Sequence, residues 1–253
     1  MNKLAIVTGA SSGIGEATAR RLAKLGYNLV ITARRRERLE KLAEELISTY
    51  GIKIQILCFD VRDRIATEEA LATIDKSLGD ICVLMNNAGL AAGLEHIDQG
   101  STDDWDRMID TNVKGVLYVT RIVSQMMIAA GKGGHIFNVG SIAGIQTYEN
   151  GAVYCASKHA MHALSQGMRI DFLKYGIKVT ELRPGMVETE FSTVRFHGDQ
   201  ERADNVYKGV TPLVGDDIAA VIEYCLSLPA HVNLNDIEIM PTQQANAYYT
   251  HRN

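Results

Sequence analysis

The chain has 253 residues, of which 46% are hydrophobic and 22% are charged. This composition is that of an ordinary globular protein and excludes a disordered or collagen-like chain. The formal net charge of −4 argues against wholesale nucleic-acid binding, which depends on neutralising phosphates. The sequence shows no export leader and no uninterrupted apolar run that would span a membrane, so we expect a cytoplasmic protein without a membrane or nucleic-acid partner.

Short apolar runs alternate with helical patterns along the whole chain. Several of these runs are apolar almost throughout, which is typical of strands buried on both faces of a parallel sheet. The seven predicted strands cover residues 4–8, 28–32, 53–59, 82–86, 135–139, 178–182 and 236–240. Because strands and helices alternate, right-handed crossovers would place helices on both faces of the sheet. The sequence therefore predicts an α/β fold.

Helical patterns fill the gaps between the predicted strands. One helix is predicted from about 102 to 130, where several glycines end it, and another over roughly 152–174. The stretch at about 189–212 departs from the alternation of strands and helices. We interpret it as a lid-like insertion within a single domain of residues 1–253.

A glycine-rich turn follows the first predicted strand directly. Within Thr8–Gly15, the residues Gly9, Gly13 and Gly15 let the backbone turn tightly and approach a pyrophosphate, and a helix pattern follows at once. The G-x3-G-x-G spacing differs from the usual G-x-G-x-x-G fingerprint, and an ordinary strand-to-helix turn also explains a lone glycine cluster. The strand before the turn and the helix after it favour a dinucleotide site.

Basic residues follow the second predicted strand, where dinucleotide-binding folds meet the adenosine ribose. An acid there would accept from the 2′-hydroxyl of NAD, whereas Arg34 and Arg35 favour the 2′-phosphate of NADP. The plainer alternative is a solvated helix start, which we expect to hold for Arg36. Asp60 ends the third strand and is placed to accept from an adenine amino group. The Asn-Asn-Ala-Gly segment at 86–89 allows close approach of a ribose, although both features also suit ordinary loops.

Tyr154 and Lys158 lie four residues apart on a predicted helix and therefore share a face. A tyrosine pKa of about 10 is too high for proton exchange at neutral pH, but the ammonium and a positive nicotinamide ring would lower it. Ser141 is placed to bond the same substrate oxygen, and Asn112 to hold a water that joins Lys158 to solvent. Alone, a Tyr-x3-Lys pair is typical of a surface; here these features fall in order at successive strand ends.

In combination, these motifs resemble the short-chain dehydrogenase/reductase family over nearly the whole chain. The resemblance is carried by Thr8–Gly15, Asn86–Gly89, Asn112, Ser141, Tyr154, Lys158 and Pro184–Gly185. It implies a Rossmann-type, doubly wound parallel sheet of about seven strands. It also implies hydride transfer between a nicotinamide and a substrate carbon that bears an alcohol or a carbonyl.

The resemblance also implies a role for each matching residue. Tyr154 would be the acid/base, Ser141 would orient the substrate oxygen, Lys158 would hold the ribose and lower the tyrosine pKa, and Asn112 would support a proton relay. The implied cofactor is NADP. Its implied contacts are Gly9, Ser11, Ser12, Gly13, Ile14, Gly15, Arg34, Arg35, Asp60, Val61, Asn87, Ala88, Gly89, Tyr154, Lys158, Pro184, Gly185, Val187 and Thr189.

A narrower resemblance lies in the second half of the chain. The segments 189–199 and 228–241 are similar to the NADP-dependent 3-hydroxy acid dehydrogenases, also called serine dehydrogenases. This subgroup implies serine, allo-threonine, 3-hydroxyisobutyrate or 3-hydroxypropionate as substrate, or the matching 3-oxo acid. Two other functions stay open, namely reduction of other carbonyls or 3-oxoacyl carriers, and non-enzymatic sensing of NADP. A sensor would be expected to have lost the Ser-Tyr-Lys set, which is intact here.

The carboxylate of a 3-hydroxy acid requires a cation, and Arg195 is our candidate because its guanidinium suits bidentate binding. The alternative pairs Arg195 with Glu190 or Asp199. Arg183 departs from the family pattern, in which a small residue commonly precedes the proline, and it would either crowd the nicotinamide side or point away.

No metal is assigned, because the histidines and cysteines lack ligand spacing, apart from the weak pair His159 and His162. The long helices beginning near 102 and 152 carry more apolar residues than one sheet face needs. We therefore expect a homo-oligomer, either a dimer or a homotetramer, although an ordinary core would also explain them.

Overall fold

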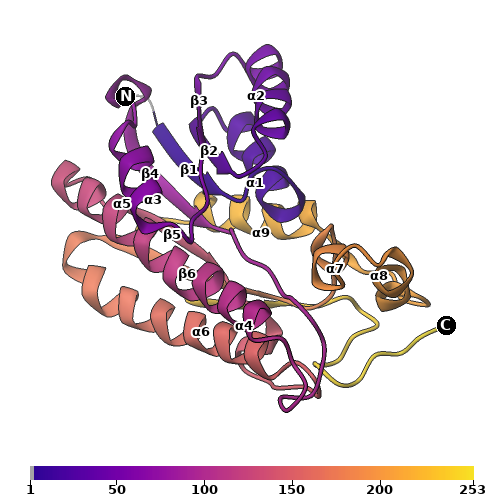
Figure 1. Cartoon of the computed structure of the whole chain (residues 1–253). Coiled ribbons are helices and arrows are strands. Elements are labelled where there is room, and N and C mark those ends of the chain that lie inside the picture. The colour runs from indigo at the N-terminus through magenta and orange to yellow at the C-terminus, as the bar shows by residue number, and fades with distance from the viewer. Residues whose placement is uncertain (1–2) are drawn as a thin grey trace.

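The computed structural model describes residues 3–253. Seven parallel strands form one sheet in the order β3-β2-β1-β4-β5-β6-β9 (Figure 1). They are β1 (Lys3–Thr8), β2 (Asn28–Ala33), β3 (Ile54–Cys58), β4 (Asp80–Asn86), β5 (Gly134–Val139), β6 (Ile177–Pro184) and β9 (Asp236–Ile239). The predicted Rossmann-type α/β fold is confirmed, and each of the seven predicted strands overlaps one of these.

Nine α-helices accompany the sheet in the part of the chain that the structure describes. They are α1 (Gly13–Lys24), α2 (Arg36–Tyr50), α3 (Arg64–Ala72), α4 (Thr102–Ile109), α5 (Val116–Ala130), α6 (Ala152–Phe172), α7 (Phe191–Arg195), α8 (Gln200–Tyr207) and α9 (Gly215–Ser227). Helices α1, α2 and α9 pack on one face of the sheet, and α3, α5 and α6 pack on the other.

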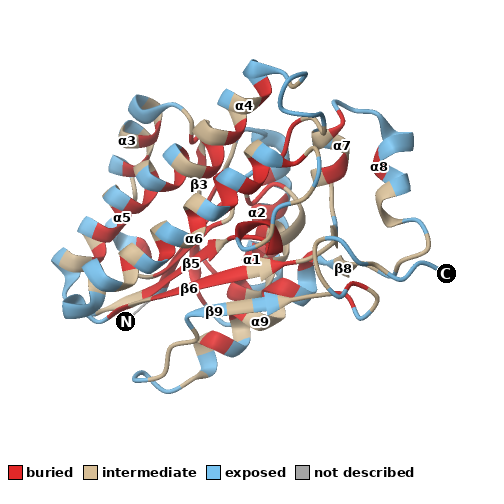
Figure 2. Cartoon of the chain, turned by 90° about the horizontal axis from the view of Figure 1, so that it is seen from below, coloured by how far each residue is buried: buried red, intermediate tan, exposed pale blue. Residues whose placement is uncertain are grey.

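The two faces of the sheet are apolar because side chains alternate along each strand. In β1, Ala5 and Val7 belong to the core under α1, α2 and α9, whereas Leu4 and Ile6 belong to the core under α3, α5 and α6. All four side chains are fully buried. Figure 2 shows the same arrangement as buried residues along β5 and β6 and on the sheet-facing sides of the helices. This burial on both faces produces the nearly continuous apolar runs in the sequence.

The single helix predicted from 102 to 130 is interrupted in the structure. A wider π-helical turn, Asp110–Gly115, separates α4 from α5. Gly115 allows this turn to approach the loop after β3, because an added Cβ would lie 2.8 Å from Val61 Cγ2. By length and composition alone, Thr102–Ala130 would be long and apolar enough to cross a membrane. Buried core helices meet the same criterion, and α5 packs its apolar side on the sheet.

The segment predicted as a lid-like insertion, about 189–212, holds α7 and α8. Beside it, β7 (Val187–Glu188) pairs with β8 (Leu213–Val214) in a separate two-stranded sheet that the sequence patterns missed. Strands of two residues are too short to leave an alternating pattern. The role of this segment as a lid, and the assignment of the whole chain to one domain, stay predictions.

His135 is a buried titratable group in β5 that contributes to stability rather than to the site. Its Nε2 lies 2.7 Å from Thr180 Oγ1, and its ring stacks on Phe137 at 3.9 Å between centroids. Burial, together with the charge of Lys178, lowers the pKa of His135 to about 3. The imidazole is therefore neutral in the folded protein across the ordinary pH range.

Replacing this histidine should reduce the acid sensitivity of the fold. Between pH 6.5 and about 3, the unfolded chain binds a proton at His135 that the folded protein does not, so stability falls as pH falls. From pH 7 to 4.5, this contribution amounts to about 2–3 kcal/mol. We expect the free energy of unfolding to fall less between pH 7 and 4.5 in His135→Gln than in the wild type, by this amount. Urea titrations of both proteins at the two pH values measure the difference. Parallel losses in both proteins would contradict the neutral-imidazole assignment.

Candidate active site

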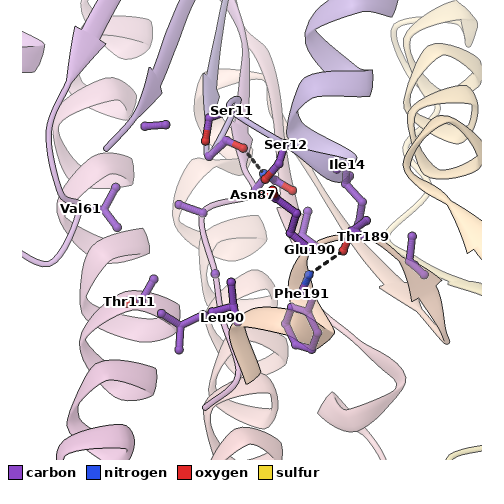
Figure 3. A pocket seen from close by; sticks show the side chains of 18 of the residues that line it. Ser11, Ser12, Ile14, Val61, Asn87, Leu90, Thr111, Thr189, Glu190 and Phe191 are labelled. Atoms are coloured by element: carbon purple, nitrogen blue, oxygen red, sulfur yellow. Dashed lines mark hydrogen bonds between the residues drawn. The ribbon is translucent and has the colours of Figure 1, made fainter. Parts of the chain in front are cut away.

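A cavity of about 310 Å³ opens at the carboxyl ends of the strands. It lies where the order of strands reverses, because β1 is flanked by β2 on one side and by β4 on the other. Ligands of doubly wound sheets bind at this position. Every residue predicted to bind the cofactor lines this cavity except Gly15, and Figure 3 shows side chains that face it.

The turn after β1 fits a phosphate group. Gly9 and Gly13 have φ values of +66° and +56°, which residues other than glycine rarely adopt. Ser12 caps α1 without a side-chain hydrogen bond, so the first-turn amides remain available to an anion. Gly15 lies behind the turn, since an added Cβ would be 2.4 Å from Asn87 Nδ2. That amide donates to the Gly9 carbonyl at 3.1 Å and braces the turn.

Arginines gather at the far end of the cavity. Arg35 donates through Nη2 to Ser11 Oγ at 3.1 Å and to Ser12 Oγ at 3.0 Å. Arg34 also lines the cavity, and its Nη1 lies 3.7 Å from Asp60 Oδ2. The guanidinium groups of Arg34 and Arg35 and the free amides of α1 provide the hydrogen-bond donors that a phosphorylated dinucleotide needs. Arg36, exposed as expected, pairs with Glu40 at 3.7 Å instead.

Asp60 is held by a neighbour that sequence reasoning missed. Arg62 donates to both of its carboxylate oxygens, with Nη2 2.7 Å from Oδ2 and Nε 3.1 Å from Oδ1. Burial favours the protonated acid, but these bonds outweigh it and lower the pKa of Asp60. The side chain is therefore a fixed carboxylate at the edge of the cavity. Its predicted bond to an adenine amino group stays a prediction.

Tyr154, Ser141 and Lys158 meet at the other end of the cavity. Ser141 follows β5 and is hydrogen-bonded to the buried Tyr154 hydroxyl. The Lys158 ammonium lies 5.8 Å from the centre of the Tyr154 ring and donates to the Val139 carbonyl at 2.8 Å. The predicted shared face of the helix thus carries both side chains into one cavity.

Burial disfavours the charged forms of both groups. It raises the pKa of Tyr154, as does the neighbouring Tyr148, while the Ser141 hydrogen bond and the charge of Arg195 act in the opposite direction. Burial also lowers the pKa of Lys158 to about 8, and the buried carboxylate of Glu181 partly opposes this. The expectation that Lys158 lowers the tyrosine pKa is therefore not met by the side chains alone. The predicted lowering by the ammonium together with an oxidised nicotinamide stays a prediction.

Asn112 does not line the cavity but lies behind it, in the π-helical turn. Its Oδ1 accepts from Leu90 N at 2.9 Å, and its Nδ2 donates to Leu90 O at 2.8 Å and to Ser157 Oγ at 3.0 Å. Both amide hydrogens are therefore engaged within the protein. This geometry fixes the Leu90 loop against α6, and the predicted water relay stays a prediction.

Arg195 lies beside Tyr154 rather than beside an acid. Its Nη2 donates to the Tyr148 hydroxyl at 2.9 Å, and its guanidinium lies 5.6 Å from the centre of the Tyr154 ring. The alternative pairings are not found. Glu190 contacts Arg35 and Arg38, and Asp199 caps α8 by accepting from Arg202 N. Tyr148 was missed because no local spacing connects it to Arg195.

Arg183 points away from the nicotinamide side. Its Nη2 lies 2.9 Å from Asp236 Oδ1 and 2.7 Å from His162 Nδ1, and its Nε donates to Glu181 at 3.0 Å. His162, Glu181 and Asp236 could hold a metal by their spacing. The Arg183 guanidinium instead supplies the positive charge that these three residues face, so the cluster is an ion-pair network.

Comparison with known proteins agrees with this geometry. The short chain dehydrogenase family matches residues 3–200, and the chain belongs to that family. It is 44% identical over 245 residues to the NADP-dependent 3-hydroxy acid dehydrogenase YdfG of Salmonella typhi, covering 96% of this chain and 97% of that protein. It is 42% identical over 245 residues to sulfoacetaldehyde reductase 2 of Chromohalobacter salexigens, covering 97% and 96%.

A solved structure is similar over almost the whole length. The closed form of serine dehydrogenase complexed with NADP⁺ superposes with a TM-score of 0.92 at 41% identity, covering 99% of this chain and 100% of that one. The protein is therefore an NADP-dependent oxidoreductase acting on CH–OH groups, and the predicted resemblance and cofactor are confirmed.

Removing the tyrosine hydroxyl should abolish turnover and spare cofactor binding. Tyr154→Phe keeps the buried ring but removes the hydroxyl that we expect to exchange a proton with substrate. We expect kcat to fall by at least about 10²–10⁴-fold. The dissociation constant for NADP⁺, measured by calorimetry, should change little. Ser141→Ala, which keeps the hydroxyl of Tyr154, serves as the matched comparison, and turnover by Tyr154→Phe near the wild-type rate would contradict the assignment.

Proposed function

We propose that the protein transfers hydride between NADP and a small alcohol that carries an acid group, with 3-hydroxy acids as the substrate class. The observation that carries this proposal is the position of Arg195, whose guanidinium lies beside the rings of Tyr154 and Tyr148. A substrate alcohol bound at Tyr154 would have a cation within reach of its acid group. The relatives named for 3-hydroxy acids and serine support the same class.

In the oxidation direction, Tyr154 and Ser141 bind the substrate hydroxyl. The phenolate of Tyr154 takes the hydroxyl proton while the hydrogen on the same carbon leaves with its electron pair, and the substrate becomes a carbonyl compound. Bound NADP⁺ supplies the hydride acceptor. Lys158 holds the ribose and adds positive charge that favours the phenolate. Reduction of a 3-oxo acid reverses each transfer.

The residues around the cavity divide by their chemistry. We assign Arg34 and Arg35 to the 2′-phosphate, since both line the cavity after β2, on the side of β1 away from β5. Asp60 and Val61 are assigned to the adenine. The remaining assignments follow the cavity wall: Gly9–Gly15 to the pyrophosphate, Asn87–Gly89 to a ribose, and Pro184, Gly185, Val187 and Thr189 to the nicotinamide side.

A sulfonate is a second candidate for the acid group. Guanidinium binds sulfonate and carboxylate oxygens alike, and two relatives at 42% and 44% identity are sulfoacetaldehyde reductases. The sensor alternative is disfavoured because Ser141, Tyr154 and Lys158 come together in one cavity.

We also propose a homo-oligomer in the cytoplasm. Apolar side chains remain exposed at the outer side of α6 and just beyond it, with Ile170 and Leu173 each 77% exposed. A second copy of the chain packed on this surface would remove them from water. The expected assembly is a dimer or a homotetramer.

Removing the Arg195 guanidinium should weaken acid substrates selectively. For Arg195→Ala we expect KM for 3-hydroxypropionate to rise about 10- to 100-fold, as when a hydrogen bond to a charged group is lost. KM for 1-propanol, which has no acid group, should change little. Arg202→Ala, a nearby arginine that stacks on Phe196 instead, is the matched control. An equal change for both substrates would overturn the role of Arg195.

A further inference from the structure

Helix α7 is tethered at both ends, and the two tethers lead to opposite ends of the active site. Before the helix, the Glu190 carboxylate contacts Arg38 at 2.7 Å and Arg35 at 2.8 Å (Figure 3 shows Glu190 facing the cavity). At its last residue, Arg195 donates to Tyr148, and its carbonyl accepts from Gly93 N at 2.9 Å. The helix thus connects the arginine cluster to the tyrosines.

Five residues are too few for α7 to hold its conformation alone, because isolated helices of this length are unstable in water. Its position must therefore come from its contacts. Phe191 packs edge-on against Tyr154, with ring centres 5.7 Å apart, and Ser192 bonds the Tyr207 hydroxyl at 2.8 Å. Neither contact involves Arg35 or Arg38. Among these contacts, only those of Glu190 join the helix to the arginines.

The charges at that end balance when a phosphate is added. Arg34, Arg35 and Arg38 carry three positive charges, a phosphate monoester carries about two negative charges, and Glu190 carries one. Hydrogen bonds from Arg35 and Arg38 outweigh burial and lower the pKa of Glu190, so this carboxylate is ionised. Arg35 lines the cavity, whereas Arg38 is outside the set of lining residues. Arg38 is therefore placed to hold Glu190 while Arg35 also serves the cofactor.

We propose that Glu190 and Arg38 are positioning residues that seat α7 and so place Arg195 beside Tyr154. The proposal rests on the proposed function, which gives Arg195 its purpose. Neither residue touches the reacting atoms. The Arg38–Glu190 ion pair, which we call the clasp, joins the arginine end of the cavity to the site proposed for the acid group, and its loss would loosen the substrate end.

The single tryptophan offers a readout that does not depend on turnover. Trp105 lines a small cavity together with Arg195 and Tyr154, and it packs on the same apolar cluster as Phe191. Movement of α7 away from this cluster would open Trp105 to water. Quenching of its fluorescence by acrylamide therefore reports how firmly α7 is seated.

The test compares Arg38→Gln, Glu190→Gln and the double variant, each saturated with NADP⁺. Arg36→Gln is the control, because Arg36 lies on the same helix turn but pairs with Glu40. Loss of one partly exposed ion pair should raise the ratio of unseated to seated α7 by up to about fivefold. The acrylamide quenching constant of Trp105 should therefore rise in both single variants. The double variant should rise no further than Glu190→Gln alone, since that change already removes the partner of Arg38.

The kinetic readout is a rise in KM for 3-hydroxypropionate with little change in kcat, in the same variants and not in Arg36→Gln. Unchanged quenching in Arg38→Gln and Glu190→Gln would overturn the proposal. So would effects that add in the double variant, or an equal effect in Arg36→Gln. Failure of the wild type to turn over any acid substrate would instead refute the proposed function, and the quenching comparison would still decide whether the clasp exists.

Discussion

The reversal of strand order between β1 and β4 is the constraint on which the site depends. Chain segments leaving the two strands pass to opposite faces of the sheet, where α1 and α5 pack, so their starting loops diverge and leave a crevice (Figure 1). The glycine turn after β1 and the Asn87 loop after β4 form the two walls of that crevice, and Asn87 bonds them together. Ser141 after β5 and Gly185 after β6 extend the same edge toward the substrate end.

Burial gives the chemical end a particular electrostatic character. It disfavours the phenolate of Tyr154 and the ammonium of Lys158 together. With a pKa of about 8, Lys158 still carries its charge at neutral pH, whereas the raised pKa of Tyr154 keeps the phenol neutral. A positive nicotinamide would favour the phenolate, and Ser141 and Arg195 already act in that direction. We therefore expect proton exchange at Tyr154 to depend on the bound cofactor. Arg195 has two parts in this arrangement. Its charge opposes the rise of the tyrosine pKa, and we propose that it also binds the acid group of the substrate.

The sequence predicted what local spacing and strand order determine. Strands buried on both faces leave apolar runs, and the Thr8–Gly15 turn and the Tyr154–Lys158 pair are short motifs, so the sheet and these parts of the cavity followed from the chain alone. The wall at 184–189 was predicted from the family resemblance instead. The ion pairs did not, because Arg38 and Glu190 lie far apart in sequence and only the fold joins them. The π-helical turn at Asn112 also escaped prediction, since a break that adds no glycine or proline at its start leaves the helical pattern intact.

The central claim is hydride transfer to NADP from an alcohol that carries an acid group. It is tested most directly by following NADPH formation from 3-hydroxypropionate, L-serine, L-allo-threonine, 3-hydroxyisobutyrate and 2-hydroxyethanesulfonate, with 1-propanol as the neutral comparison and NAD⁺ in parallel. The account predicts that at least one acid is oxidised with a far higher kcat/KM than 1-propanol, and with NADP⁺ far better than with NAD⁺. If no acid gave NADPH, or if 1-propanol were oxidised as readily as any of the acids, the central claim would be contradicted.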